Sequence, residues 1–159
     1  MIEYFQFELT QGKVARIDED NWDSLSSFSW SAMKSRRGQY YAVRGVWENG
    51  KVIRKWLHRE IMNCPAGMFV DHINGDSMDN RRENLRICTS KQNSQNQKRR
   101  INNTTGVKGV FFNKFGSYVV TIRDNGKAKY LGSFKTLDEA TTVRREAELR
   151  CYGEFARPA

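Results

Sequence analysis

The spacing of apolar and polar residues divides the chain into β-rich and helical stretches. In the first 57 positions apolar residues come in short runs between turn residues, with a strand at Val14–Ile17 and a small helical piece at 20–28. Tyr40–Val43 and Val52–Trp56 flank Glu48-Asn49-Gly50, and an Asn-Gly pair supplies the positive φ angles that a two-residue turn needs. This segment therefore predicts a β-hairpin.

The pattern changes after residue 57. Leu57–Met62 predicts a short helix, and an apolar strand at 68–73 leads into a polar loop at 74–83. A second strand at 85–89 follows, and 90–100 predicts a helix that begins at an N-cap serine. The order is strand, loop, strand and helix.

The last third of the chain has its own pattern. Strands at 107–112, 117–123 and 127–134 are separated by turn residues, and Thr136-Leu137-Asp138-Glu139 forms a capping box. Apolar residues then recur at helical spacing until Gly153, so we expect three antiparallel strands with one helix across one face.

These patterns predict an α+β protein in four parts. We expect a β-rich segment at 1–57 that packs on a core at 58–100, a linker at 101–106 within the polar, basic and turn-rich run 97–106, and a C-terminal domain at 107–159. The length of 159 residues suits one ordinary domain or two small ones.

Charge narrows the choice of partner. Lys and Arg number 27 against 18 Asp and Glu, which gives a net charge of +9 and favours an acidic polymer, nucleic acid first. An anionic membrane is the weaker choice, because no stretch is long and apolar enough to span one and no basic amphipathic helix dominates. The N-terminus lacks a secretory pattern and the three cysteines are scattered, so we expect a reducing, cytoplasmic setting and no structural zinc.

One set of residues fits phosphodiester hydrolysis, which needs an activated water and a cation beside the phosphate. His72 is able to take a proton from water near neutral pH, and Asp71 is a hard oxygen ligand for Mg²⁺ or Mn²⁺. Asn84 and Asn93 follow in the second strand region and the helix, which would return Asn93 towards Asp71. Neighbours in a regular strand face opposite ways, but the Asp71-His72 pair sits at a strand end.

Four blocks in this order resemble the HNH homing-type endonucleases of phages and mobile introns. The blocks, which cover about residues 57 to 97, are Leu57-His58-Arg59, Asp71-His72-Ile73-Asn74-Gly75-Asp76, Asp79-Asn80-Arg81-Arg82-Glu83-Asn84-Leu85-Arg86 and Gln92-Asn93-Ser94-Gln95-Asn96.

The resemblance implies a ββα-metal fold with His72 as general base and one divalent ion, Mg²⁺ in preference to Mn²⁺. It assigns Asp71 and Asn93 as metal ligands and Asn84 as the residue that braces the loop of the histidine. Asn at the final ligand position favours a hard cation over zinc.

Several neighbouring residues leave alternatives open. His58 either packs against the core or contacts metal or phosphate, and Asn80 competes with Asn84 for the bracing role. Asp76 and Asp79 are either extra ligands or carboxylates that bond their own loop.

Basic residues around the predicted site favour phosphate contact over an ordinary solvated surface. They are Arg81, Arg82, Arg86, Lys98, Arg99 and Arg100.

The C-terminal part resembles the DNA-binding domain of plant ethylene-response factors. The resemblance spans about residues 104 to 156, in Gly106-Val107-Lys108-Gly109-Val110, Tyr118–Asp124, Tyr130-Leu131-Gly132-Ser133-Phe134 and Thr136–Ala140. It implies a sheet that enters the major groove, with Lys108, Arg123 and Lys129 at contact positions. Phe111, Phe112 and Asn113 stand where the plant pattern is arginine-rich, which favours phosphate contact over base readout.

The sequence thus predicts a metal-dependent endonuclease that acts on duplex DNA, in the host cytoplasm if phage-encoded; it does not determine the oligomeric state, for which a monomer is favoured. The alternative is a non-catalytic DNA-binding or regulatory protein with a decayed nuclease fold. An RNA-binding protein ranks below both, because the aromatic, glycine-rich motifs of single-strand readers are missing.

Overall fold

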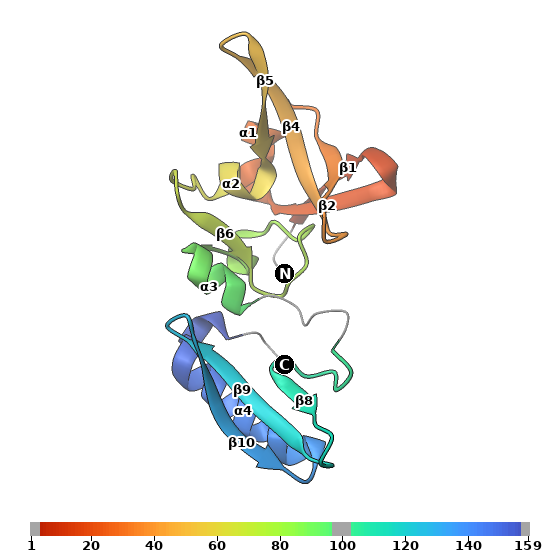
Figure 1. The fold of residues 1–159 in the computed structure, drawn as a ribbon. Coiled ribbons are helices and arrows are strands. Elements are labelled where there is room, and N and C mark those ends of the chain that lie inside the picture. Colours follow the sequence, from red (N-terminus) through yellow and green to blue (C-terminus); the bar gives the residue numbers. More distant parts are fainter. Residues whose placement is uncertain (1–3, 97–102, 157–159) are drawn as a thin grey trace. The chain divides into compact units, whose positions relative to one another are not determined.

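The computed structural model describes residues 4–96 and 103–156, which form two compact units, Met1–Ser94 and Gln95–Ala159. The first unit carries three small antiparallel sheets (Figure 1). Its elements in chain order are β1 (Tyr4–Leu9), β2 (Lys13–Asp18), α1 (Trp22–Leu25), β3 (Ser31–Lys34), β4 (Tyr40–Glu48), β5 (Lys51–Trp56), α2 (Leu57–Ile61), β6 (Phe69–His72), β7 (Leu85–Cys88) and α3 (Ser90–Gln95).

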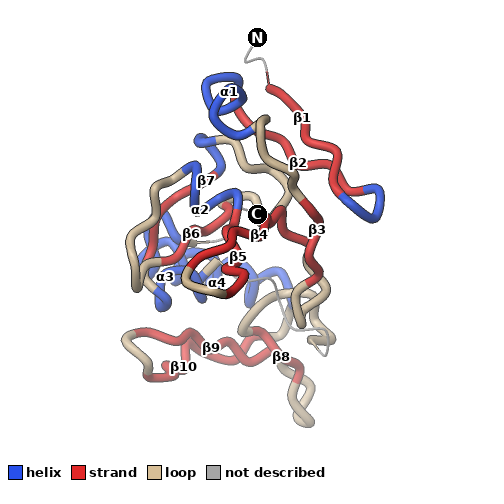
Figure 2. Tube along the Cα trace, turned by 90° about the horizontal axis from the view of Figure 1, so that it is seen from above, coloured by secondary structure: helices blue, strands red, loops and turns tan. Residues whose placement is uncertain are grey.

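The sheets of the first unit are β1-β2, β3-β4-β5 and β6-β7. The β4–β5 hairpin is confirmed, and its turn residues Asn49 and Gly50 have the positive φ angles of 51° and 76° that the sequence predicts. β1 and β3 are strands for which we had no prediction, and they pair with β2 and β4 respectively (Figure 2).

One hydrophobic core joins the N-terminal strands to the β6–β7 hairpin. It runs from Phe7 and Ile17 in the first hairpin through Leu57 to Val70 and Leu85. Around it the rings of Phe5 and Phe7 stack on Trp22, at centroid separations of 4.9 and 5.1 Å. Residues 4–57 therefore share a core with the segment that carries Asp71 and His72.

The second unit has the three-stranded sheet and the single helix that the sequence predicts. The strands are β8 (Val110–Phe112), β9 (Tyr118–Asp124) and β10 (Lys127–Phe134), in the order β10-β9-β8, and α4 (Leu137–Tyr152) packs on one face through Ala140 and Ala147. The Thr136 capping box is present and Gly153 ends the helix.

The first of these strands is shorter than predicted, because β8 begins at Val110 rather than at Val107. Gly106 and Gly109 have φ angles of 82° and 77°, which interrupt an extended run. A Cβ on Gly109 would lie 2.5 Å from the carbonyl oxygen of Thr121 and 2.8 Å from the guanidinium of Arg144, so the site requires glycine. Arg144 is itself buried and bonds Glu148 and the Thr121 carbonyl.

α3 ends at Gln95, and the predicted continuation of this helix to Arg100 lies largely outside the described residues, as does part of the predicted linker. Across the described residues no helix combines the length and the apolar character needed to cross a bilayer.

Candidate functional site

The β6–β7 hairpin sets the register of the candidate site. Asp71 pairs with Arg86 across the ladder and His72 pairs with Leu85. The Arg86 guanidinium binds the Asp71 carboxylate at 2.7 Å, and their side chains are only 12% and 7% exposed. Arg86, predicted to contact DNA, therefore neutralises a buried carboxylate within this unit.

His72 faces a different set of groups from Asp71, as strand alternation requires. Its Nε2 lies 3.3 Å from Oδ1 of Asn80, and its ring lies 5.2 Å from the His58 ring and 6.2 Å from the Tyr41 ring, centroid to centroid. Burial lowers the pKa of His72, while the Asn80 bond and the carboxylates of Asp71, Asp76 and Asp79 act in the opposite direction. The imidazole is therefore neutral at neutral pH and able to accept a proton.

Asn80 also settles which nitrogen of His72 carries that proton. The Nδ2 of Asn80 donates to the Met78 carbonyl at 3.1 Å, so its Oδ1 faces the histidine. An amide oxygen only accepts hydrogen bonds, so His72 carries hydrogen on Nε2 and presents Nδ1 as the basic nitrogen. The sequence offered Asn80 only as a rival loop brace, and this orienting contact was missed.

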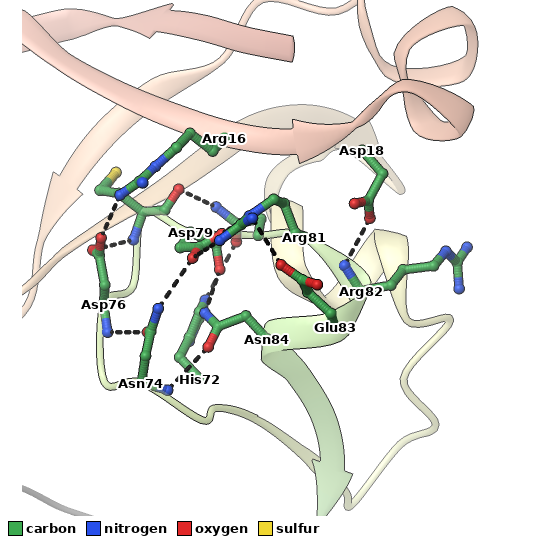
Figure 3. A network of polar contacts seen from close by, with 12 residues as sticks. Arg16, Asp18, His72, Asn74, Asp76, Asp79, Arg81, Arg82, Glu83 and Asn84 are labelled. Carbon is green, nitrogen blue, oxygen red and sulfur yellow. Dashed lines mark hydrogen bonds and ion pairs between the residues drawn. The ribbon is translucent and has the colours of Figure 1, made fainter. Parts of the chain in front are cut away.

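Asn84 spans the base of the loop between the two strands (Figure 3). Its Oδ1 accepts from the backbone N–H of Asn74 at 2.9 Å, and its Nδ2 donates to the carbonyl of Asp79 at 2.8 Å. Its own carbonyl accepts from the N–H of Ile73 at 2.9 Å. These bonds fix the loop directly after His72.

The loop is held from outside by β2. The backbone N–H of Arg16 donates to Met78, and the N–H of Asn80 donates back to the Arg16 carbonyl, both at 2.8 Å. The Arg16 side chain pairs with Asp76 at 2.9 Å, and Asp18 accepts from the N–H of Arg82 (Figure 3). The N-terminal hairpin thus supports the loop beside the candidate base, which sequence spacing gave no reason to expect.

Of the two loop carboxylates, Asp76 caps its own turn by accepting from the N–H of Met78. Asp79 is buried, binds the Arg81 guanidinium with both oxygens at 2.8 Å and accepts from Asn74, and the Arg81 bond lowers the pKa of Asp79. Both aspartates are engaged by the loop and by neighbouring arginines.

His58 lies at the start of α2 and is buried beside His72. Burial lowers the pKa of His58 to about 3, with smaller contributions from His72 and Arg59. Its Nδ1 has no hydrogen-bond partner within residues 4–96 and 103–156. His58 is therefore a neutral ring against the candidate base.

Asn93 lies on α3, which runs beside β6 in both views (Figures 1 and 2). Its backbone N–H donates to the Thr89 carbonyl at 2.9 Å. Cys88 ends β7, just before this helix, and burial, with a smaller contribution from Asp71, raises the pKa of its thiol to about 11 against the opposing effect of the Asn93 backbone. Within the described residues, however, no three His, Cys, Asp or Glu side chains form a metal-binding group.

The arginines predicted to bind DNA in the loop of the first unit differ in their contacts. Arg81 pairs with Asp79 and Glu83, whereas Arg82 is exposed. Lys98, Arg99 and Arg100 lie outside the described residues.

In the second unit Lys108 donates to the carbonyl of Gln95. Arg123 is exposed opposite Ala128, on the face away from α4. Lys129 pairs in register with the buried Ile122 and binds Asp124 at 2.8 Å, so it projects from the other face. Arg123 and Lys129 therefore do not serve one surface of the sheet.

The exposed aromatic residues of this unit lie on or near the sheet rather than in a core. Phe111, Phe112 and Phe115 are 47%, 55% and 80% exposed.

Comparisons with known proteins agree with the chemistry of the first unit. Residues 63–95 match the HNH endonuclease family. A protein of Acanthamoeba polyphaga mimivirus, named an uncharacterized HNH endonuclease, is 28% identical over 151 residues, which cover 93% of this chain and 75% of that protein. Protein 3.8 of Escherichia phage T7 is 32% identical over 94 residues, which cover 58% of this chain and 77% of that protein.

No solved structure gives a significant match. The family match covers the hairpin, the loop and the helix that hold Asp71, His72, Asn84 and Asn93, and the mimivirus match extends over both units. Residues 63–95 thus form an HNH endonuclease family domain, and the chain has relatives in a giant virus and a phage.

Proposed function

We propose that this chain hydrolyses a phosphodiester bond in duplex DNA, with His72 as the general base. The observation that carries the proposal is the neutral, buried imidazole of His72, which Asn80 orients through Nε2 so that Nδ1 remains basic. General-base help of this kind is worth about 10²- to 10⁴-fold in rate.

In the proposed reaction Nδ1 of His72 takes a proton from water, and the water oxygen attacks phosphorus. The bond from phosphorus to the leaving sugar oxygen breaks, and that oxygen takes a proton from solvent. Asn84 holds the loop so that His72 stays in line for the attack.

We also propose one divalent ion, Mg²⁺ in preference to Mn²⁺, held by Asp71 and Asn93. The donor chemistry fits: a carboxylate and an amide oxygen are hard ligands, and an Mg²⁺ site with few protein ligands keeps water and phosphate oxygens as the rest. Such a site does not need the three-residue groups that the described residues lack. When bound, the ion would neutralise charge on the phosphate and on the leaving oxygen.

Arg86 would stabilise the Asp71 carboxylate and contribute to phosphate binding. Its ion pair with Asp71 offsets the cost of a buried carboxylate. The guanidinium also places a cation beside the proposed phosphate position, where it would attract the DNA backbone.

The second unit would position the cut, in the manner of homing-type enzymes. Its sheet face away from α4 carries Arg123, and Tyr130 lies on that face at 65% exposure. This part of the proposal rests on the resemblance to ethylene-response factors and on the exposed sheet face.

A non-catalytic DNA-binding role is the competing function. The Asp71–Arg86 ion pair favours it, because an arginine that occupies the carboxylate of a former metal ligand would be expected in a site that no longer binds metal.

The test is nicking of supercoiled plasmid by the purified chain with Mg²⁺, with Mn²⁺ and with excess chelator. We expect metal-dependent nicking that Asp71→Asn abolishes, while Asp23→Asn, at an exposed aspartate of the same unit, cuts like the parent. DNA binding without nicking under any metal condition would favour the non-catalytic role.

A further inference from the structure

The outer half of the β4–β5 hairpin exposes two large apolar side chains opposite one another. Trp47 pairs with Val52 across the ladder, and they are 71% and 67% exposed. The far end of the hairpin projects beyond the other elements of the first unit (Figure 1). An exposed tryptophan leaves a large apolar area in contact with water, which is unfavourable unless a partner covers it. This pair is therefore a candidate contact surface.

The two faces of the hairpin differ in charge. In-register pairs share a face, so one face, which we call the ribbon face, consists of Tyr41, Val43, Gly45, Trp47, Val52, Arg54 and Trp56. It contains no acidic residue. Arg54 is exposed on it, and no hydrogen bond or ion pair of its guanidinium is found within the described part of the chain.

The opposite face is used within the unit. There Arg44 binds Glu60 at 2.9 and 3.0 Å and lies over the Phe28 ring, and Lys55 pairs with Glu48 at 3.2 Å. Val43, near the inner end of the ribbon face, is buried, so the outer part with Trp47, Val52 and Arg54 is the side of the hairpin left for a partner, and its only formal charge is positive.

The inner end of the ribbon face reaches the candidate active site. The Tyr41 ring contacts Trp56, and both contact the ring of His58, with centroid separations of 5.6, 5.7 and 5.9 Å. Tyr41 also contacts His72. A polymer bound along this face would pass the residues that are proposed to cut it.

We propose that the ribbon face binds duplex DNA next to the bond that is cut, with Arg54 on a phosphate and Trp47 and Val52 against base edges. The inference rests on the proposed action on duplex DNA, and the positive charge of the ribbon face together with its ring contacts to the candidate site favours a polyanion as its partner. A two-stranded ribbon fits the major groove. Trp47 lies six positions after Tyr41, and at about 3.4 Å per residue the face extends about 20 Å, or about six base pairs.

The test measures binding of the full chain to a 30-base-pair duplex of mixed sequence, by fluorescence anisotropy in chelator so that no cutting occurs. We expect Trp47→Ala to weaken binding about tenfold or more, and Arg54→Ala to weaken it several-fold and reduce the salt slope by about one. Two controls should bind like the parent: Lys51→Ala, exposed on the opposite face, and Val14→Ala, exposed on β2. Unchanged circular dichroism establishes that the exposed-site variants fold.

Nicking of plasmid by the same proteins separates this inference from the proposed function. If the parent does not cut but Trp47→Ala still weakens binding, the DNA surface stands and the nuclease proposal fails. If Trp47→Ala and Arg54→Ala bind DNA within twofold of the parent, the ribbon face does not contact DNA. A dimer in sedimentation that Trp47→Ala dissolves, without loss of DNA binding, would show instead that this face joins two copies of the chain.

Discussion

Replacing Asn84 by alanine removes the brace of the loop beside His72. Asn84 is buried, with only 6% of the residue exposed. The substitution deletes its hydrogen bonds to the Asn74 N–H and to the Asp79 carbonyl. Two hydrogen bonds contribute about 2 kcal/mol, and leaving the buried carbonyl without its donor adds about 1 to 2 kcal/mol. We expect the free energy of unfolding of the first unit to fall by about 3 to 4 kcal/mol.

Tryptophan fluorescence in urea measures this loss in the first unit alone. All four tryptophans lie within it: Trp22, Trp30, Trp47 and Trp56. At a typical m of about 1.5 kcal/mol/M, the urea midpoint should fall by about 2 M. Gln6→Ala, at an exposed amide of β1, is the matched control and should change stability by less than about 0.5 kcal/mol.

The same variant should lose nicking activity at temperatures where it is still folded, by about 10²-fold, because a loosened loop misplaces His72. If Asn84→Ala were as stable as Gln6→Ala and cut as fast as the parent, the bracing role of Asn84 would be refuted.

Acid, backbone and salt perturbations give three further predictions. The pKa of His58 is about 3 and that of His72 is also lowered, whereas both are about 6.5 in the unfolded chain, so the stability of the first unit is complete above about pH 6.5 and falls as pH drops towards 3. His58→Leu should reduce that pH slope of unfolding in urea, and an equal slope would contradict the buried neutral ring. Gly109→Ala should lower the melting temperature of the second unit far more than Gly116→Ala, which has the same φ of 77° but open space around it. Equal losses in circular dichroism melts would show that close packing at Gly109 is unimportant. Arg123→Ala should weaken DNA binding and flatten its salt dependence by about one unit, and an unchanged slope would remove Arg123 from the interface.

Local sequence signals predicted the elements with strong turn or cap chemistry. Asn49-Gly50 gave the β4–β5 hairpin, and Thr136 with Glu139 gave the start of α4. The alternation of buried and exposed residues in β1 was also readable in the sequence, although we made no prediction from it. Each of these signals lies within a few neighbouring residues.

The missed features all depend on residues that are far apart in the sequence. The loop after His72 is held by Arg16 and Asp18, about 60 residues earlier, and no spacing rule connects them. The side-chain partners of Arg81 and Arg86 were also unpredicted, because a basic residue looks the same whether it meets phosphate or a buried carboxylate. The types of residue in the sequence indicated which residues belong to the candidate site. The contacts that each of them makes depend on the tertiary structure.

The role of His72 as general base is tested by the rate of metal-dependent plasmid nicking by His72→Ala beside the parent, with DNA binding measured for both. We expect that the parent nicks with Mg²⁺, that His72→Ala is slower by about 10²- to 10⁴-fold while binding DNA equally, and that added imidazole restores part of the rate. A His72→Ala protein that folds, binds DNA and cuts as fast as the parent would contradict the assignment of His72 as general base.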